Sequence, residues 1–197
     1  MFKMNKLILS TCIAGCMASS TWAADPVGAD FGHGTLHFTG SVINSPCSIA
    51  PGDEDINVPL GQVANKILEA GAGYSQTQPI TIHLQNCDLV KRDNVPSGTT
   101  GHVNYPEFSK VVVHFAGSAD AKNAGLYANT GTAQGVGIRL IDTMSGNVAL
   151  EANNPAAGYS LTAGDNILKF GARLEKNGDA VATGTVAADV TYSMEYK

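Results

Sequence analysis

The clearest structural pattern in this 197-residue chain lies at residues 186–196, VAADVTYSMEY. Apolar residues recur there at every second position, with polar or small residues between them. The alternating set is Val186, Ala188, Val190, Tyr192, Met194 and Tyr196. Successive side chains of a β-strand point to opposite faces, so a period of two predicts a strand with one buried face.

The same alternation recurs upstream, which predicts further strands. It is found at residues 35–39, 80–84, 111–115, 136–140 and 168–174. Residues that favour turns, such as Pro51-Gly52 and Asn177-Gly178, separate these runs. Helix is expected only as a turn within residues 62–72, where glycines weaken the pattern. Several short strands joined by turns predict an all-β sandwich of the immunoglobulin type.

The N-terminal segment has the features of a secretory signal peptide over residues 1–23. Lys3 and Lys6 precede a short apolar run, and Thr21-Trp22-Ala23 is a plausible cleavage site before Ala24. The run Ile13-Ala14-Gly15-Cys16 offers an alternative, a lipoprotein with its lipid on Cys16. No later apolar run approaches the roughly 18 residues of a membrane helix, so no membrane span is expected.

Two of the four cysteines, Cys47 and Cys87, remain after cleavage. An even count in an oxidising compartment predicts a disulfide, and the alternative is a pair of buried free thiols. A loop of about 40 residues closed in this way contributes roughly 4 kcal/mol in the chain-entropy account.

Charge and motif content argue against several functions. The chain has 12 basic and 17 acidic residues, and cleavage removes Lys3 and Lys6 to leave a net charge of −7. This balance argues against nucleic acid as a partner. The histidines show no metal-ligand spacing, and His83 and His114 are expected to face solvent. Asp53-Glu54-Asp55 is interpreted as a solvated turn, with a weak calcium site as the alternative. No nucleophile and base are paired, so neither an enzyme nor a cofactor is expected.

Two segments are unusual for a sandwich. Residues 24–34 are rich in Gly and Ala and precede the first predicted strand without an obvious partner. A frayed N-terminus is the simplest explanation of such a segment. Residues 91–108 form a long polar stretch with two prolines and two glycines, and loops of this length are usually functional or disordered.

Sequence landmarks in a fixed order resemble one family of exported proteins. They are GTLHFTGSV at 34–42, VPLGQV at 58–63, IHLQNCD at 82–88 and GVGIRL at 135–140. Tyr196 is penultimate, and Gly184 is the fourteenth residue from the end. Together with the two cysteines, these landmarks resemble the subunits of chaperone–usher fimbriae, such as type 1 fimbrial major pilins. The resemblance covers essentially the whole mature chain and is interrupted mainly at residues 91–108.

The resemblance implies an incomplete immunoglobulin-like β-sandwich that lacks its last strand and is completed by a donor strand from a neighbouring subunit. Residues 24–38 would be the N-terminal donor-strand arm and residues 39–197 the pilin domain. The arm residues that would enter the neighbour are Val27, Ala29, Phe31, Gly32, Gly34, Leu36 and Phe38. Val27, Ala29 and Phe31 point one way and the other four point the opposite way. Gly32 and Gly34 both remain candidates for the pocket that accepts no side chain.

The implied partners are other copies of the chain or related pilins, a periplasmic chaperone and an outer-membrane usher. The chaperone would pair along the C-terminal strand, at residues 185–196. Its zipper would involve Gly184, Val186, Val190, Tyr192, Met194 and Tyr196. The implied location is the cell-surface fimbrium, reached through the periplasm.

The sequence leaves three functional hypotheses, each for a different class of protein. The resemblance favours a structural subunit of the fimbrial shaft that supports bacterial adhesion. The alternative is a pilin-like minor or tip subunit that binds a host glycan, although tip adhesins of this family usually carry a separate lectin domain. An exported enzyme or lipoprotein domain is the third, and turnover or a lipid on Cys16 would distinguish it.

Overall fold

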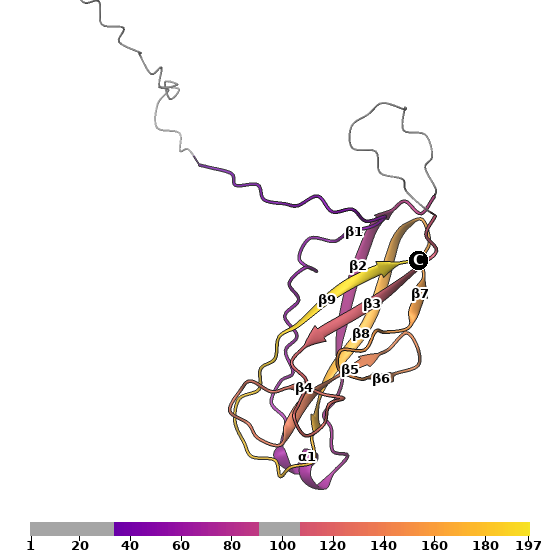
Figure 1. The fold of residues 1–197 in the computed structure, drawn as a ribbon. Helices are drawn as coiled ribbons and strands as arrows, with labels where there is room; N and C mark the ends of the chain where they lie inside the picture. The colour runs from indigo at the N-terminus through magenta and orange to yellow at the C-terminus, as the bar shows by residue number, and fades with distance from the viewer. Residues whose placement is uncertain (1–33, 91–106) are drawn as a thin grey trace, which may run out of the picture. The chain divides into compact units, whose positions relative to one another are not determined.

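The computed structural model describes residues 34–90 and 107–197 (Figure 1). The chain divides into two units, residues 1–42 and residues 43–197. The predicted signal peptide, the first ten residues of the predicted arm and most of the polar stretch at 91–108 lie outside the described residues. In the first unit, residues 34–42 form neither helix nor strand.

The second unit contains two antiparallel sheets. The first has the order β1(Ser48–Ile49), β2(Gln78–Cys87), β8(Gly164–Lys176), β5(Val136–Asp142) and β4(Tyr127–Ala128), and β6(Val148–Leu150) also pairs with β5. The second has the order β7(Gly158–Ser160), β3(Lys110–Gly117) and β9(Val190–Tyr196). The single helix of the described residues, α1(Asn65–Ala70), has six residues, far fewer than a bilayer crossing requires.

The predicted all-β fold is confirmed, with two corrections to the strands. Four of the predicted runs lie in β2, β3, β5 and β8, and the predicted helical turn is α1. The strand predicted at residues 35–39 is wrong, because these residues have no neighbouring strand in the described chain. The last strand begins at Val190 instead of Thr185. Upstream of Val190 the chain follows the irregular segment 129–134 instead of β3.

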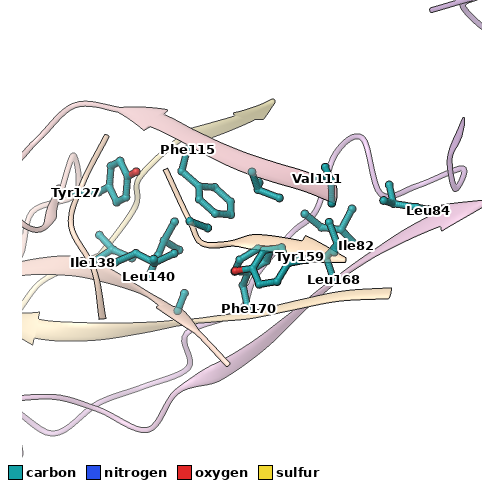
Figure 2. Packing of buried hydrophobic residues seen from close by; sticks show 14 of the residues in the cluster. Ile82, Leu84, Val111, Phe115, Tyr127, Ile138, Leu140, Tyr159, Leu168 and Phe170 are labelled. Atoms are coloured by element: carbon teal, nitrogen blue, oxygen red, sulfur yellow. The ribbon is translucent and has the colours of Figure 1, made fainter. Parts of the chain in front are cut away.

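The core lies between the two sheets, and its centre is Phe170 of β8 (Figure 2). The ring of Phe170 packs edge-on against Phe115 of β3, with a centroid separation of 5.0 Å, and against Tyr159 of β7, at 5.8 Å. Ile82 and Leu84 of β2 are also buried, so strands from both sheets contribute to one apolar core.

Strand β5 departs from the simple alternation of buried and exposed residues, because the side chains on both of its faces are buried. Arg139, on the outer face, donates to the carbonyl of Gly125 at 2.7 Å and pairs with Glu151 at 3.1 Å and Glu175 at 3.2 Å. Burial alone would raise the pKa of Glu175, but the hydrogen bonds from Arg139 and Arg173 outweigh it and leave that pKa below its ordinary value. The buried guanidinium is therefore matched by polar partners.

A disulfide joins Cys47 to Cys87, 40 residues apart in the sequence, as predicted. Cys47 immediately precedes β1, and Cys87 is the last residue of β2. The bond therefore fixes the two-residue strand β1 onto its neighbour at the edge of the first sheet.

Two neighbouring residues of β8 test which face of the strand points into the core. Leu168→Ala removes a side chain that is 1% exposed and should lower the free energy of unfolding by about 2–5 kcal/mol. Ile167→Ala is the matched control, because Ile167 is 48% exposed and its truncation should cost about 1 kcal/mol or less. Urea unfolding of both variants measures the difference. Equal losses would contradict the register, since a slip of one residue exchanges the two faces.

Candidate functional site

The C-terminal strand β9 has one unpaired edge. It is the last strand of its sheet, with β3 on one side and no strand of the described chain on the other. Lys110 and Lys197 exchange both of their backbone hydrogen bonds, which sets the phase of the ladder. In an antiparallel ladder the bonded residues alternate, so Glu195, Ser193 and Thr191 also bond to β3. The N–H and C=O groups of the intervening residues, including Tyr192 and Met194, therefore point to the open edge.

The inward face of β9 is apolar but only half-buried. Its inward side chains are those of Val190, Tyr192, Met194 and Tyr196, and they pack against the core without being enclosed by it. On the adjacent strand, Val111 and Val113 have no exposed surface. The inward face of β9 is therefore covered less completely than that of its neighbour.

A second apolar wall begins in β1, at Ile49, and continues toward α1. Its half-buried side chains are Ile49, Ile56, Val58, Leu60 and Val63, which also pack against the core. A hollow of about 210 Å³ lies between β9 and the start of this wall, at Ile49 and the preceding residues 43–45. Its lining is Ile43, Asn44, Ser45, Ile49, Tyr192, Ser193, Met194 and Tyr196. We call this hollow the edge groove, and we call the two apolar rows that meet at it, on β9 and on residues 49–63, its walls.

Sequence comparison assigns the family. A profile of the fimbrial protein family matches residues 36–197, which include both cysteines, both walls of the edge groove and all of β9. The chain belongs to the fimbrial protein family. The fimbrial-like protein YgiL of Escherichia coli K12 is 37% identical over 175 residues, which cover 86% of this chain and 88% of that protein.

Two solved structures share the fimbrial fold. One is a chaperone–usher pilus studied for the uncoiling of its rod, with 26% identity, a TM-score of 0.67 and coverage of 85% of this chain and 97% of the other. The second is the P pilus rod subunit PapA, with 25% identity, a TM-score of 0.60 and coverage of 78% and 100%. These proteins are structural pilins, so membership of the family identifies this fimbrial protein as a structural protein and not an enzyme.

Tyr192 crosses the edge groove of the fimbrial protein. Its hydroxyl donates a hydrogen bond of 2.7 Å to the backbone carbonyl of Asp53, in the turn that follows β1. The carboxylate of Asp53 in turn accepts from the backbone N–H of His83 at 2.6 Å and lies 2.8 Å from its Nδ1. Burial raises the pKa of the Tyr192 hydroxyl, and the negative charges of Asp53 and Glu54 add to the effect, so the hydroxyl stays protonated and donates.

The turn predicted at Asp53-Glu54-Asp55 is present, but it is not wholly solvated, because Asp53 and Glu54 accept hydrogen bonds from within the protein. The backbone N–H of Gly52 donates to the carboxylate of Glu54, and the backbone N–H of His83 donates to the carboxylate of Asp53. Among the described residues, no group of three or more His, Cys, Asp or Glu side chains is placed to hold a metal ion. His83 and His114 have side chains 46% and 42% exposed, in agreement with the solvent-facing positions expected of them.

Residues 180–189 are held to residues 129–135 immediately before β9 begins. Ala182 and Gln134 exchange backbone hydrogen bonds, and Ala133 donates to the carbonyl of Thr185 at 2.9 Å. A Cβ at Gly184 would lie inside van der Waals contact of the Thr132–Ala133 backbone, with 2.7 Å to the Ala133 Cα. Gly184, predicted as a member of the C-terminal zipper, therefore has a local role as a close backbone contact, and it lies outside β9.

The other predicted zipper residues share one face. Val186 lies before β9, and Val190, Tyr192, Met194 and Tyr196 lie within it, all half-buried on the same side. Of the predicted donor residues, Val27, Ala29, Phe31 and Gly32 lie outside the described residues. Gly34, Leu36 and Phe38 are described, and the side chains of Leu36 and Phe38 are 80% and 89% exposed. Sequence reasoning missed Asp53 as a groove residue, because its function depends on a backbone carbonyl that no side-chain pattern reveals.

Adding a methyl group at Gly184 tests its close contact. Gly184→Ala should lower the free energy of unfolding by about 1–3 kcal/mol, because the new Cβ displaces the backbone of residues 132–133. Gly158→Ala in β7 is the matched control, since its Cβ would meet its nearest neighbour at an ordinary 3.6 Å. Thermal unfolding of the two variants measures the contrast, and a tolerated Gly184→Ala would refute the contact.

Proposed function

We propose that this fimbrial protein is a shaft subunit of a chaperone–usher fimbria, that it polymerises by donor-strand exchange and that the resulting fibre supports bacterial adhesion. The observation that carries the proposal is the open edge of β9 beside a half-buried apolar face. The likeness to the rod subunit PapA supports a place in the shaft.

The open edge calls for a partner on physical grounds. An unpaired edge that exposes apolar side chains is a site of aggregation unless another strand covers it. A strand laid along β9 would bond to the free N–H and C=O groups of alternate residues from Val190 to Tyr196, and its own alternate side chains would cover the apolar face. Strand addition of this kind is the established mode of chaperone–pilin complementation. The incomplete sandwich, lacking one strand, is thus part of the proposal.

The donor in our proposal is the arm of another copy, residues 24–38. Alternation in an extended chain places Gly34, Leu36 and Phe38 on one face. Large apolar side chains that are 80–89% exposed are unfavourable in water and gain free energy when a groove buries them. The arm therefore has the composition expected of a strand that completes the sandwich of a second molecule.

Assembly would proceed in two steps. A periplasmic chaperone would first cover the edge groove, pairing along residues 185–196. At the outer-membrane usher the arm of the next subunit would replace it, and the finished fimbrium would lie on the cell surface. The net negative charge and the disulfide of Cys47 and Cys87 are compatible with that route.

Bulky substitution in the arm tests the proposed exchange. Gly32→Leu and Gly34→Leu each place a branched side chain on the face that carries Leu36 and Phe38. At least one of them should abolish fibres without changing the unfolding midpoint of the subunit, because only the intermolecular fit is altered. Electron microscopy of cells counts the fibres. Thr35→Leu is the control, since residue 35 points the other way, and normal fibres from both glycine variants would sink the proposal.

A further inference from the structure

One hydrogen bond, from the Tyr192 hydroxyl to the Asp53 carbonyl, joins β9 to the turn after β1 beside the edge groove. Tyr192 comes from β9 in the second sheet, and His83 comes from β2 in the first. Both bind Asp53, which receives the Tyr192 hydroxyl on its backbone carbonyl and the His83 N–H and ring on its carboxylate. One residue thus connects the two walls of the edge groove.

We propose that Asp53, Tyr192 and His83 form a clasp that fixes the spacing between β9 and the opposite wall, and so positions the open edge of β9 to receive a strand. The proposal rests on the proposed function, because it assigns a positioning role to residues of the same groove. It adds to that function a device that acts before the strand arrives.

The need for a clasp follows from how β9 is held. Within the described part of the chain its backbone ladder runs to β3 alone, whereas a central strand is held on both sides. The half-buried apolar faces of β9 and residues 49–63 attract each other in water, which favours a narrower gap. A phenol ring is rigid, and with its hydroxyl fixed 2.7 Å from the Asp53 carbonyl it acts as a spacer of defined length.

The anchor of the spacer is itself fixed. Ala50 donates to the carbonyl of His83 at 2.9 Å, and Asp53 donates to the carbonyl of Ala50 at 3.0 Å, so the turn lies on β2. The carboxylate of Asp53 adds two contacts to His83 and is largely shielded, with 18% of its side chain exposed. The carbonyl that receives Tyr192 is therefore held by the first sheet, which the disulfide also secures.

The test uses hydrogen exchange of the free protein. The amides of Thr191, Ser193 and Glu195, which bond to β3, should exchange about five-fold faster in both clasp variants. Tyr192→Phe removes the hydroxyl that bonds to the Asp53 carbonyl. Asp53→Ala keeps that carbonyl but removes the carboxylate that ties the turn to His83, so the carbonyl is no longer held in place. The double variant should exchange no faster than the faster single variant, since both changes release the same clasp. Tyr74→Phe and Asp55→Ala are the matched controls and should leave these amides unchanged.

A second measurement follows the binding of a synthetic peptide of residues 24–38 to the dilute protein, at a temperature well below the unfolding midpoint. Tyr192→Phe and Asp53→Ala should each raise the Kd of the peptide about five-fold, chiefly by slowing its association. A purely structural role would lower the midpoint and leave the association rate unchanged, which would overturn the proposal. Unchanged exchange of the β9 amides would also overturn it. Faster exchange in the variants, with no peptide binding by the unaltered protein, would instead overturn the proposed function and leave the clasp intact.

Discussion

The edge of β9 has no paired strand among the described residues, and beside it lies an apolar face that is only half-buried. Water satisfies the free N–H and C=O groups of β9, but it cannot satisfy the apolar row that the same residues present to the core. A self-contained sandwich would bury that row under one more strand of its own. In this chain the row stays half-buried, and the proposed arm contains two exposed apolar side chains, Leu36 and Phe38, that match it in kind.

The two walls of the edge groove are stabilised in different ways. The wall formed after β1 is tied to β2 by a disulfide, by the hydrogen bonds of the turn and by the contacts of Asp53 with His83. The wall formed by β9 depends on its ladder to β3 and on the packing of residues 180–189 against residues 129–135. One wall is thus anchored to the first sheet, and the other has one edge without a paired strand among the described residues, which agrees with the proposed strand exchange.

Much of the fold follows from the sequence, because a strand with one buried face shows apolar residues at every second position. That is why β2, β3, β8 and β9 were predictable. The short strands β1, β4, β6 and β7 span two or three residues, which is too few for a period to be seen. Residues 35–39 alternate as strongly as a real strand, but pairing requires a neighbour, and in this chain none is present among the described residues.

The groove was predictable only in part. The family landmarks near the C-terminus indicated which side chains of β9 line it. The burial of Arg139 depends on loops that cover β5, and the crossing contact of Tyr192 depends on where a turn presents a backbone carbonyl. Both arise from tertiary packing, which local patterns in the sequence do not encode.

The central claim, that the sandwich is completed by a strand from outside, has one direct test. The protein from Ala24 to Lys197 is compared with a form that lacks its arm and carries residues 24–38 after a flexible linker at the C-terminus. Our account predicts that the self-complemented form unfolds at a midpoint higher by tens of degrees, because the added strand covers the edge of β9 in every molecule. Equal midpoints would contradict it, since they would show that the sandwich is already complete.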